Sequence, residues 1–148
     1  MTYMDEAIKE AEIGIKNKEG GPFGVVIVDK AGHMIAKGHN QVLKTKDPTA
    51  HAEINAIRRA CKKLKTKDLS NCIMYSTCEP CPMCLAAIIW SNIKIVYYGS
   101  TKKDAARIGF KDDDIYEHIK GNKELLKEWN TNDQSCKNLF KNYDGEIY

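Results

Sequence analysis

Apolar residues recur at three- and four-residue steps near the start of the chain, over residues 3–17. This spacing predicts an amphipathic helix. The same spacing predicts a second helix over residues 51–64, and an apolar stretch with a proline at its second position predicts a third over residues 81–90. The apolar positions of the first helix are Met4, Ile8, Ala11 and Ile15.

Four stretches between these helices have the composition of strands, and they cover residues 23–29, 33–40, 71–77 and 93–99. The first is nearly all apolar, as expected for a central strand that is covered on both faces. Strands that alternate with helices indicate a layered α/β domain, in which the strands after the two central helices run parallel.

The pattern weakens beyond residue 100. Short helices are predicted within "DDDIYEHIKG" and "SCKNLFKNY", with a polar stretch between them. The chain of 148 residues has no repeat and no low-complexity linker, so we expect one domain over residues 1–148. The weak packing signal after residue 120 is compatible with a segment that needs a partner.

Charge and cysteine placement narrow the functional classes. A net charge of +3, from 23 basic and 20 acidic residues, argues against a strongly basic nucleic-acid binder. The six cysteines lie in apolar and helical stretches and do not frame loops, which favours a reducing compartment. The first residues contain neither a signal peptide nor a membrane span. We therefore expect a cytoplasmic protein with no membrane partner.

Three cysteines crowd the stretch "STCEPCPMCLAA" at Cys78, Cys81 and Cys84, and a disulfide, a redox pair and a metal site are the alternatives. Pro82 is well placed to start a helix, which puts Cys81 and Cys84 on one face near the helix N-terminus. That position favours the thiolate, the form that binds metal. The C-x-x-C spacing alone fits a redox pair equally well.

A second stretch, "DPTAHAEINAI", favours the metal site. His51 stands at the start of the earlier helix, and helix starts in a layered fold can meet at one edge of the sheet. His51, Cys81 and Cys84 would leave one coordination position open, as in a catalytic zinc site. Glu53 could exchange a proton with a water there, although the spacing alone leaves open which way Glu53 faces. The alternative is a closed structural site with Cys78 as fourth ligand.

His51-Ala52-Glu53 followed by Pro80-Cys81-Pro82-Met83-Cys84 resembles the signature of zinc nucleobase deaminases. With "GGPFGVVIV", "HNQVLKTKDPTAHAEINAIRRAC" and "DAARIGFKDDDIY", nearly the whole chain resembles the bacterial-type guanine deaminases of the cytidine deaminase superfamily. The resemblance implies a three-layer α/β/α fold with a mixed five-stranded sheet. It also implies one Zn²⁺ per subunit and hydrolysis of guanine to xanthine and ammonia, with Glu53 as the catalytic carboxylate.

The resemblance further implies substrate contacts. Asn40 would hydrogen-bond the purine, Asp112 would accept from its amino and ring N–H edge, and Tyr148 would close over it. Trp90 could stack near the base. Family members commonly form homodimers that exchange their C-terminal segments, here about residues 120–148.

The sequence leaves several alternatives for the substrate and its contacts open. Asp113 or Asp114 could take the role of Asp112, and Lys111 stands where relatives often have an acid. The tRNA adenosine deaminases share "DPTAHAEI" and the cysteine pair, but they typically have a histidine in place of Trp90 and a basic C-terminal helix. A deaminase of nucleosides or of other aminated heterocycles is a further alternative.

Overall fold

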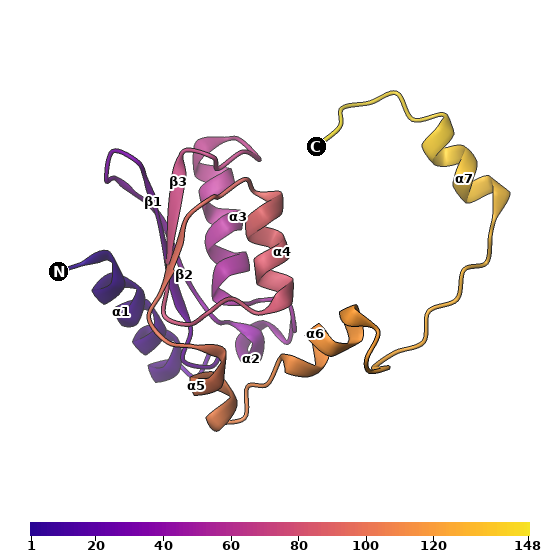
Figure 1. Ribbon diagram of the computed structural model, residues 1–148. Helices are drawn as coiled ribbons and strands as arrows, with labels where there is room; N and C mark the ends of the chain where they lie inside the picture. The colour runs from indigo at the N-terminus through magenta and orange to yellow at the C-terminus, as the bar shows by residue number, and fades with distance from the viewer.

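Four strands form one mixed sheet at the centre of the protein (Figure 1), for which a computed structural model describes residues 1–148. The strand order is β2-β1-β3-β4. Strand β1 (Gly24–Asp29) pairs antiparallel with both β2 (Met34–His39) and β3 (Cys72–Ser76), and β3 pairs parallel with β4 (Val96–Tyr98). The predicted parallel pair is therefore confirmed.

The expected fifth strand is wrong for this chain. After β4, Thr101 and Asp104 form a capping box in which each side chain accepts a hydrogen bond from the backbone N–H of the other. This arrangement starts a helix at once, and only helices and irregular segments follow.

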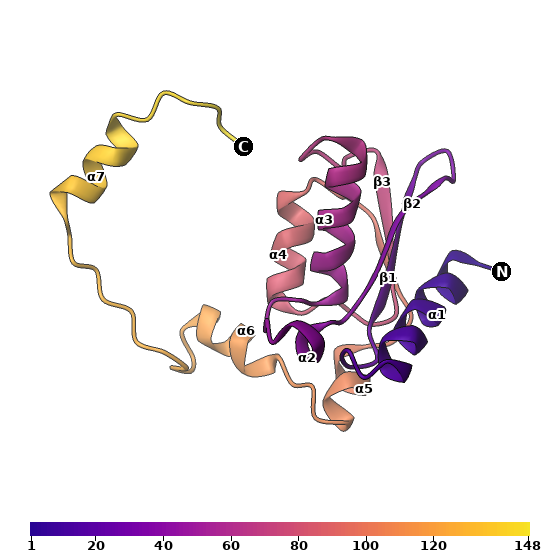
Figure 2. The ribbon, with the colours of Figure 1, turned by 180° about the vertical axis from the view of Figure 1, so that it is seen from behind.

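Helices cover both faces of the sheet, so the predicted three layers are confirmed (Figures 1 and 2). Helix α1 packs against one face, and α3 and α4 lie on the other. The helices are α1 (Tyr3–Lys16), α2 (Val42–Thr45), α3 (Ala52–Leu64), α4 (Pro82–Trp90), α5 (Lys102–Arg107), α6 (Asp113–Lys120) and α7 (Gln134–Lys141).

Helix α1 turns a different face to the sheet from the predicted one. Ile8 and Ile15 are exposed, and the residues buried against the sheet are instead Ala7, Glu10, Ala11 and Gly14. The cause is the close approach of α1 to β1: a Cβ on Gly24 would lie 2.0 Å from the carbonyl oxygen of Ala7. Large side chains cannot fit in so narrow a space.

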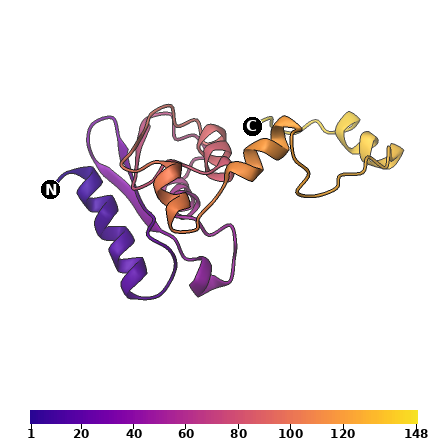
Figure 3. The ribbon, with the colours of Figure 1, turned by 60° about the horizontal axis from the view of Figure 1, so that its bottom comes forward.

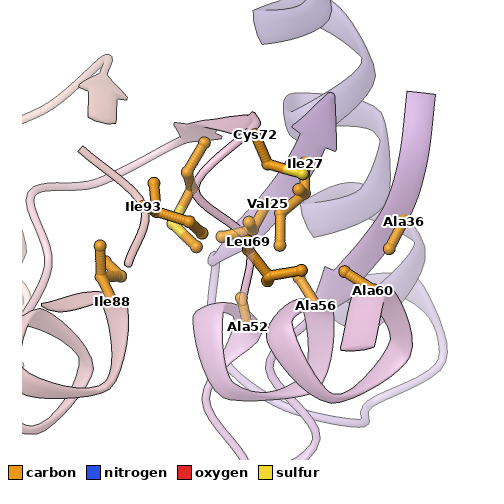
Figure 4. Packing of buried hydrophobic residues seen from close by; sticks show 11 residues of the cluster. Val25, Ile27, Ala36, Ala52, Ala56, Ala60, Leu69, Cys72, Ile88 and Ile93 are labelled. Atoms are coloured by element: carbon orange, nitrogen blue, oxygen red, sulfur yellow. The ribbon is translucent and has the colours of Figure 1, made fainter. Parts of the chain in front are cut away.

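The main core lies between the sheet and helices α3 and α4 (Figure 4). The fully buried residues that helix α3 contributes to it are all small, namely Ala52, Ala56 and Ala60. Gly38 in β2 matches them, because a Cβ there would lie 2.8 Å from the backbone of α3. The helix is therefore held close to the strands, and its first residues have a fixed position over the sheet edge.

Two short helices, α2 and α5, were absent from the predicted elements. Helix α2 has only four residues and no side-chain cap, so the sequence carries little sign of it. Helix α5 has the capping box described above, and the Thr101-x-x-Asp104 spacing is a local signal that would have located it.

The C-terminal segment projects from the layered body (Figures 1 and 3). Every residue from 121 to 148 is exposed. The segment touches the body again near its end, where Lys67 Nζ lies 3.1 Å from a carboxylate oxygen of Glu146. It carries large apolar side chains, which are Leu125, Leu126, Trp129, Leu139, Phe140, Tyr143, Ile147 and Tyr148.

Candidate active site

Helices α3 and α4 begin at the same edge of the sheet. Their N-cap residues are His51 and Cys81, both with extended backbone angles. Strands β2 and β3, which precede these helices, each run antiparallel to β1 and so parallel to one another. The expected meeting of the two helix starts therefore occurs across β1, although β2 and β3 are not neighbours in the sheet.

The His51 ring and two thiols form a compact group. His51 Nδ1 lies 3.6 Å from Cys81 Sγ and 3.4 Å from Cys84 Sγ. The three candidate ligand atoms all lie within 4.8 Å of one another. The backbone N–H of Cys84 donates to Cys81 Sγ over 3.5 Å, so the first turn of α4 fixes the position of that sulfur.

This spacing fits a zinc ion. Zn–S bonds of about 2.3 Å and Zn–N bonds of about 2.0–2.1 Å, at tetrahedral angles, separate nitrogen from sulfur by about 3.5 Å. The two observed nitrogen–sulfur distances lie on either side of that value. One histidine nitrogen and two thiols are also ligands that zinc prefers.

Hydrogen bonds within this group shift the pKa values of its members in a way that favours cation binding. The pKa of Cys81 is lowered to about 4, mainly because the Cys84 thiol donates a hydrogen bond to it and also because His51 does. The pKa of Cys84 is raised by that same hydrogen bond and by burial. The hydrogen bond to Cys81 raises the pKa of His51. A lowered pKa at Cys81 favours its thiolate, which is the form that binds metal.

Glu53 lies beside this group without belonging to it. The side chain is 6% exposed and lines the same cavity as His51 and Cys81, yet it is not one of the three clustered ligands. Burial raises the pKa of the Glu53 carboxyl. A carboxyl whose pKa is raised by burial is suited to the role of a general acid-base group.

The cavity beside the candidate metal ligands measures about 420 Å³. It is lined partly by apolar side chains, with an edge-to-face aromatic pair between Phe23 and Phe110 whose ring centroids are 5.0 Å apart. No local pattern predicts that pair, because the two residues are far apart along the chain. The remaining lining residues not yet described are Asn40, Val42, Pro48, Cys78, Glu79, Met83, Lys102, Ala105, Lys111, Asp112 and Ile115.

Asn40 lies in the cavity wall with one end of its amide already engaged. The residue is 6% exposed, and its Oδ1 accepts a hydrogen bond of 3.0 Å from the backbone N–H of Val42. The Nδ2 group is consequently the end that remains to donate to a ligand.

Asp112 is the member of the "KDDD" run that lines the cavity. It stands at the N-cap position of α6, but its side chain makes no capping hydrogen bond. Burial, followed by the charge of Cys81, raises the pKa of its carboxyl. Asp113 and Asp114 are exposed and pair with Lys102 and Lys123, over 3.4 Å and 2.9 Å respectively.

Lys111 lines the same cavity beside Asp112. A cationic side chain therefore stands at the cavity, at a position where the family resemblance implies an acid.

Trp90 and Tyr148 do not line the cavity of their own chain. Trp90 ends α4 and is 71% exposed, and Tyr148 is 80% exposed. Cys78 does line the cavity, but its thiol donates to the carbonyl oxygen of Thr101 over 3.7 Å and is not in the ligand group. The three-ligand arrangement thus fits the geometry better than the closed site with Cys78.

No helix of this protein has the length and apolar character that crossing a membrane requires.

Comparison with known proteins places this geometry in a family. Residues 1–100 match the cytidine and deoxycytidylate deaminase zinc-binding region, a stretch that holds His51, Glu53, Cys81 and Cys84. The chain belongs to this deaminase family. The resemblance read from the sequence is confirmed.

Relatives of two activities are similar to the chain. The guanine deaminase of Bacillus subtilis is 51% identical over 118 residues, which is 80% of this chain and 75% of that protein. The tRNA-specific adenosine deaminase of Aquifex aeolicus is 44% identical over 101 residues, 68% of this chain and 66% of that protein. The X-ray structure of the Bacillus subtilis guanine deaminase superposes with a TM-score of 0.85 at 40% identity, and the superposition covers 99% of this chain and 96% of that one.

Proposed function

We propose that this protein is a zinc-dependent hydrolase that converts guanine and water to xanthine and ammonia. The observation that carries the proposal is a single cavity that brings together the His51 and Cys81 ligands, the buried carboxyl of Glu53, and the polar pair Asn40 and Asp112. The likeness to a guanine deaminase extends over 99% of the chain in structure.

His51, Cys81 and Cys84 would hold one zinc ion per subunit. Bound there, zinc would supply Lewis-acid chemistry and lower the pKa of a water molecule to about 7. Three protein ligands leave room for that water, and the partly filled ligand set is typical of catalytic zinc sites.

Glu53 acts as the proton carrier. It accepts a proton from the water that attacks C2 of guanine and delivers it to the ring nitrogen beside C2. It then passes the second water proton to the 2-amino group. The bond between C2 and this exocyclic nitrogen breaks, ammonia leaves, and C2 becomes a carbonyl carbon. The raised pKa of this buried carboxyl suits a group that is protonated and deprotonated in each turnover.

Asp112 and Asn40 recognise the purine. Guanine presents two adjacent donors, N1–H and the 2-amino group, and the Asp112 carboxylate is an acceptor-only group that matches them. The Asn40 Nδ2 group donates to an acceptor on the purine, since its Oδ1 is occupied by Val42. Lys111 adds a positive charge to the lining of the same cavity.

The C-terminal segment completes the site of a second copy. Residues 121–148 expose apolar side chains that a monomer leaves in water, and burial of that surface against a partner would be favourable. In the resulting homodimer the exchanged segment brings Tyr148 over the partner subunit's cavity, and Trp90 lies where a partner can reach it. None of the six cysteines forms a disulfide, which supports a cytoplasmic location.

Ammonia release from a panel of substrates tests this function. The zinc-loaded protein is assayed with guanine, adenine, cytosine, guanosine and cytidine, and Glu53→Gln serves as the blank. Release from guanine alone, absent in the blank, is the expected result. The result that would contradict the proposal has two parts: no base or nucleoside releases ammonia, and adenosine in an anticodon stem-loop is converted to inosine. The activity would then be that of the tRNA-specific relatives.

A further inference from the structure

A buried histidine at the end of β2 lies between two carboxylates. His39 is 8% exposed, and its Nδ1 is 3.1 Å from Glu10 Oε1 on α1. Its Nε2 forms a second hydrogen bond, to Glu19 Oε2 in the loop between α1 and β1. We call these three residues the His39 clamp.

Both ring nitrogens of the buried His39 have a carboxylate partner. An ionised carboxylate can only accept hydrogen bonds, and a neutral imidazole has a single N–H to donate. Two ionised carboxylates are both satisfied only by the imidazolium form, and such charge-assisted bonds are the stronger kind. Gly14 makes room for the ring, because a Cβ at that position would lie 2.8 Å from His39 Cδ2.

Glu19 extends the clamp to the segment that follows Asn40. Its carboxylate also accepts hydrogen bonds from Gln41 Nε2 and Lys44 Nζ, each over 3.2 Å. Its backbone carbonyl accepts from the N–H groups of Leu43 and Lys44, each over 3.0 Å. The start of α2, which has no side-chain cap of its own, is thereby held by Glu19.

Asn40 is enclosed by these contacts. The chain at Gly20, next to Glu19, lies so close that a Cβ there would be 2.2 Å from Asn40 Oδ1. The backbone N–H of Asn40 donates to the carbonyl of Phe23. Asn55 Nδ2 donates over 2.9 Å to the carbonyl of His39, which ties the clamp to the helix that carries Glu53.

We propose that the His39 clamp is a positioning device for substrate recognition: it fixes the Glu19 loop and the start of α2, and so aims the Asn40 amide into the cavity. The inference rests on the proposed function, in which Asn40 binds the purine. His39, Glu10 and Glu19 touch no substrate in this scheme and act through Asn40.

The test compares Glu19→Gln, which removes the charge and keeps the shape, with a matched control. His33→Gln is that control, since His33 also pairs with a carboxylate, Asp29, at 3.0 Å but is exposed in the turn between β1 and β2. In Glu19→Gln we expect the KM for guanine to rise roughly tenfold, the effect of one misplaced hydrogen bond. The kcat and zinc content should stay within about threefold of wild type, and His33→Gln should resemble wild type throughout.

A double-mutant cycle separates positioning from plain stabilisation. If Glu19 acts through Asn40, adding Glu19→Gln to Asn40→Ala changes KM no further, because the aimed group is already gone. A KM increase of the same size in both backgrounds would overturn the proposal. A lower unfolding midpoint in Glu19→Gln with an unchanged KM would also overturn the proposal.

Amide hydrogen exchange supplies a readout that does not depend on the substrate. The amides of Val42, Leu43 and Lys44 should exchange at least about tenfold faster in Glu19→Gln and as in wild type in His33→Gln. Unchanged exchange overturns the clamp whatever the substrate is. If exchange quickens and Asn40→Ala leaves the KM for guanine unaffected, the assigned role of Asn40 in the proposed function fails, and positioning for recognition fails with it.

Discussion

Glu53 stands two residues after His51, and both side chains line one cavity. Residues two apart inside an ideal helix point about 200° apart, so the shared direction needs a cause. His51 is the N-cap of α3, with an extended backbone at φ −71° and ψ 157°, and only Glu53 lies inside the helix. The helix boundary between them lets a ligand and a proton carrier face the same space.

Replacing Glu53 by glutamine should separate catalysis from metal binding. Glu53→Gln keeps the size of the side chain and removes its ability to carry a proton, so kcat should fall roughly a hundredfold to ten-thousandfold. Zinc content by elemental analysis should match wild type, because Glu53 lies outside the ligand group. Normal turnover by this variant would remove Glu53 from the mechanism.

Substitution of a proposed zinc ligand should release the metal, whereas substitution of Cys78 should not. His51→Ala and Cys84→Ala should lose zinc, with apparent affinity falling by at least about tenfold, since each removes one of three protein ligands. Cys78→Ala should retain full zinc occupancy, because its thiol donates to Thr101 and stands apart from the group. Elemental analysis after dialysis against a weak chelator measures all three, and zinc loss in Cys78→Ala would revive the closed four-ligand site.

Asp112 and Asp114 offer a matched pair for substrate recognition. Asp112→Asn should raise the KM for guanine roughly tenfold to a hundredfold, the range for a lost hydrogen bond to a charged group. Asp114→Asn should leave KM unchanged, since Asp114 is exposed and pairs with Lys123. Steady-state kinetics at constant zinc occupancy distinguish the two variants. Equal increases in KM would show that the "KDDD" residues act through their total charge.

The sequence predicted the site better than the surroundings that hold it in place. N-cap positions and a proline at a helix start are local signals, so the starts of α3 and α4, and with them His51 and Cys81, could be located from the sequence. The buried face of α1 could not, because it depends on how closely the helix approaches Gly24 in β1.

Contacts between residues that are far apart in the sequence could not be predicted either. His39 meets Glu10 and Glu19 from 29 and 20 residues away, and no spacing rule connects such positions. Which aspartate of "KDDD" faces the cavity depends on how the chain enters α6, a matter of tertiary packing. The number of strands was set by the capping box after β4, a local signal that the expectation of a fifth strand overlooked.

The stability of the protein in acid should depend on Glu19. The hydrogen bond from His39 is the main cause that lowers the pKa of Glu19 from its ordinary value of 4.5 to about 2. A lowered carboxyl pKa stabilises the folded state above the ordinary value, and that contribution disappears as the pH falls from about 4.5 to about 2. Glu19→Gln should therefore unfold at lower urea concentration than wild type at pH 6, and the difference should shrink by pH 3.

Other carboxylates also protonate over this range, so the comparison needs a control at a carboxylate nearby in the chain. Glu12 is exposed on α1, and Glu12→Gln should follow wild type at both pH values. A Glu19→Gln difference that stays constant between pH 6 and pH 3 would contradict the assigned charge interaction.

Mixing two inactive variants should reveal whether the C-terminal segment serves its own cavity or the partner's. Tyr148 lies outside the cavity of its own chain, so the proposed exchange requires each site to take Glu53 from one subunit and Tyr148 from the other. A chain with Glu53→Gln and a chain that lacks Tyr148 should each be nearly inactive alone. When they are unfolded and refolded together, half of the dimers are mixed, and each mixed dimer has one complete site, so about a quarter of wild-type activity should return. If Tyr148 closes over its own chain's cavity, no complete site forms in any mixture and the activity stays at the level of the separate variants.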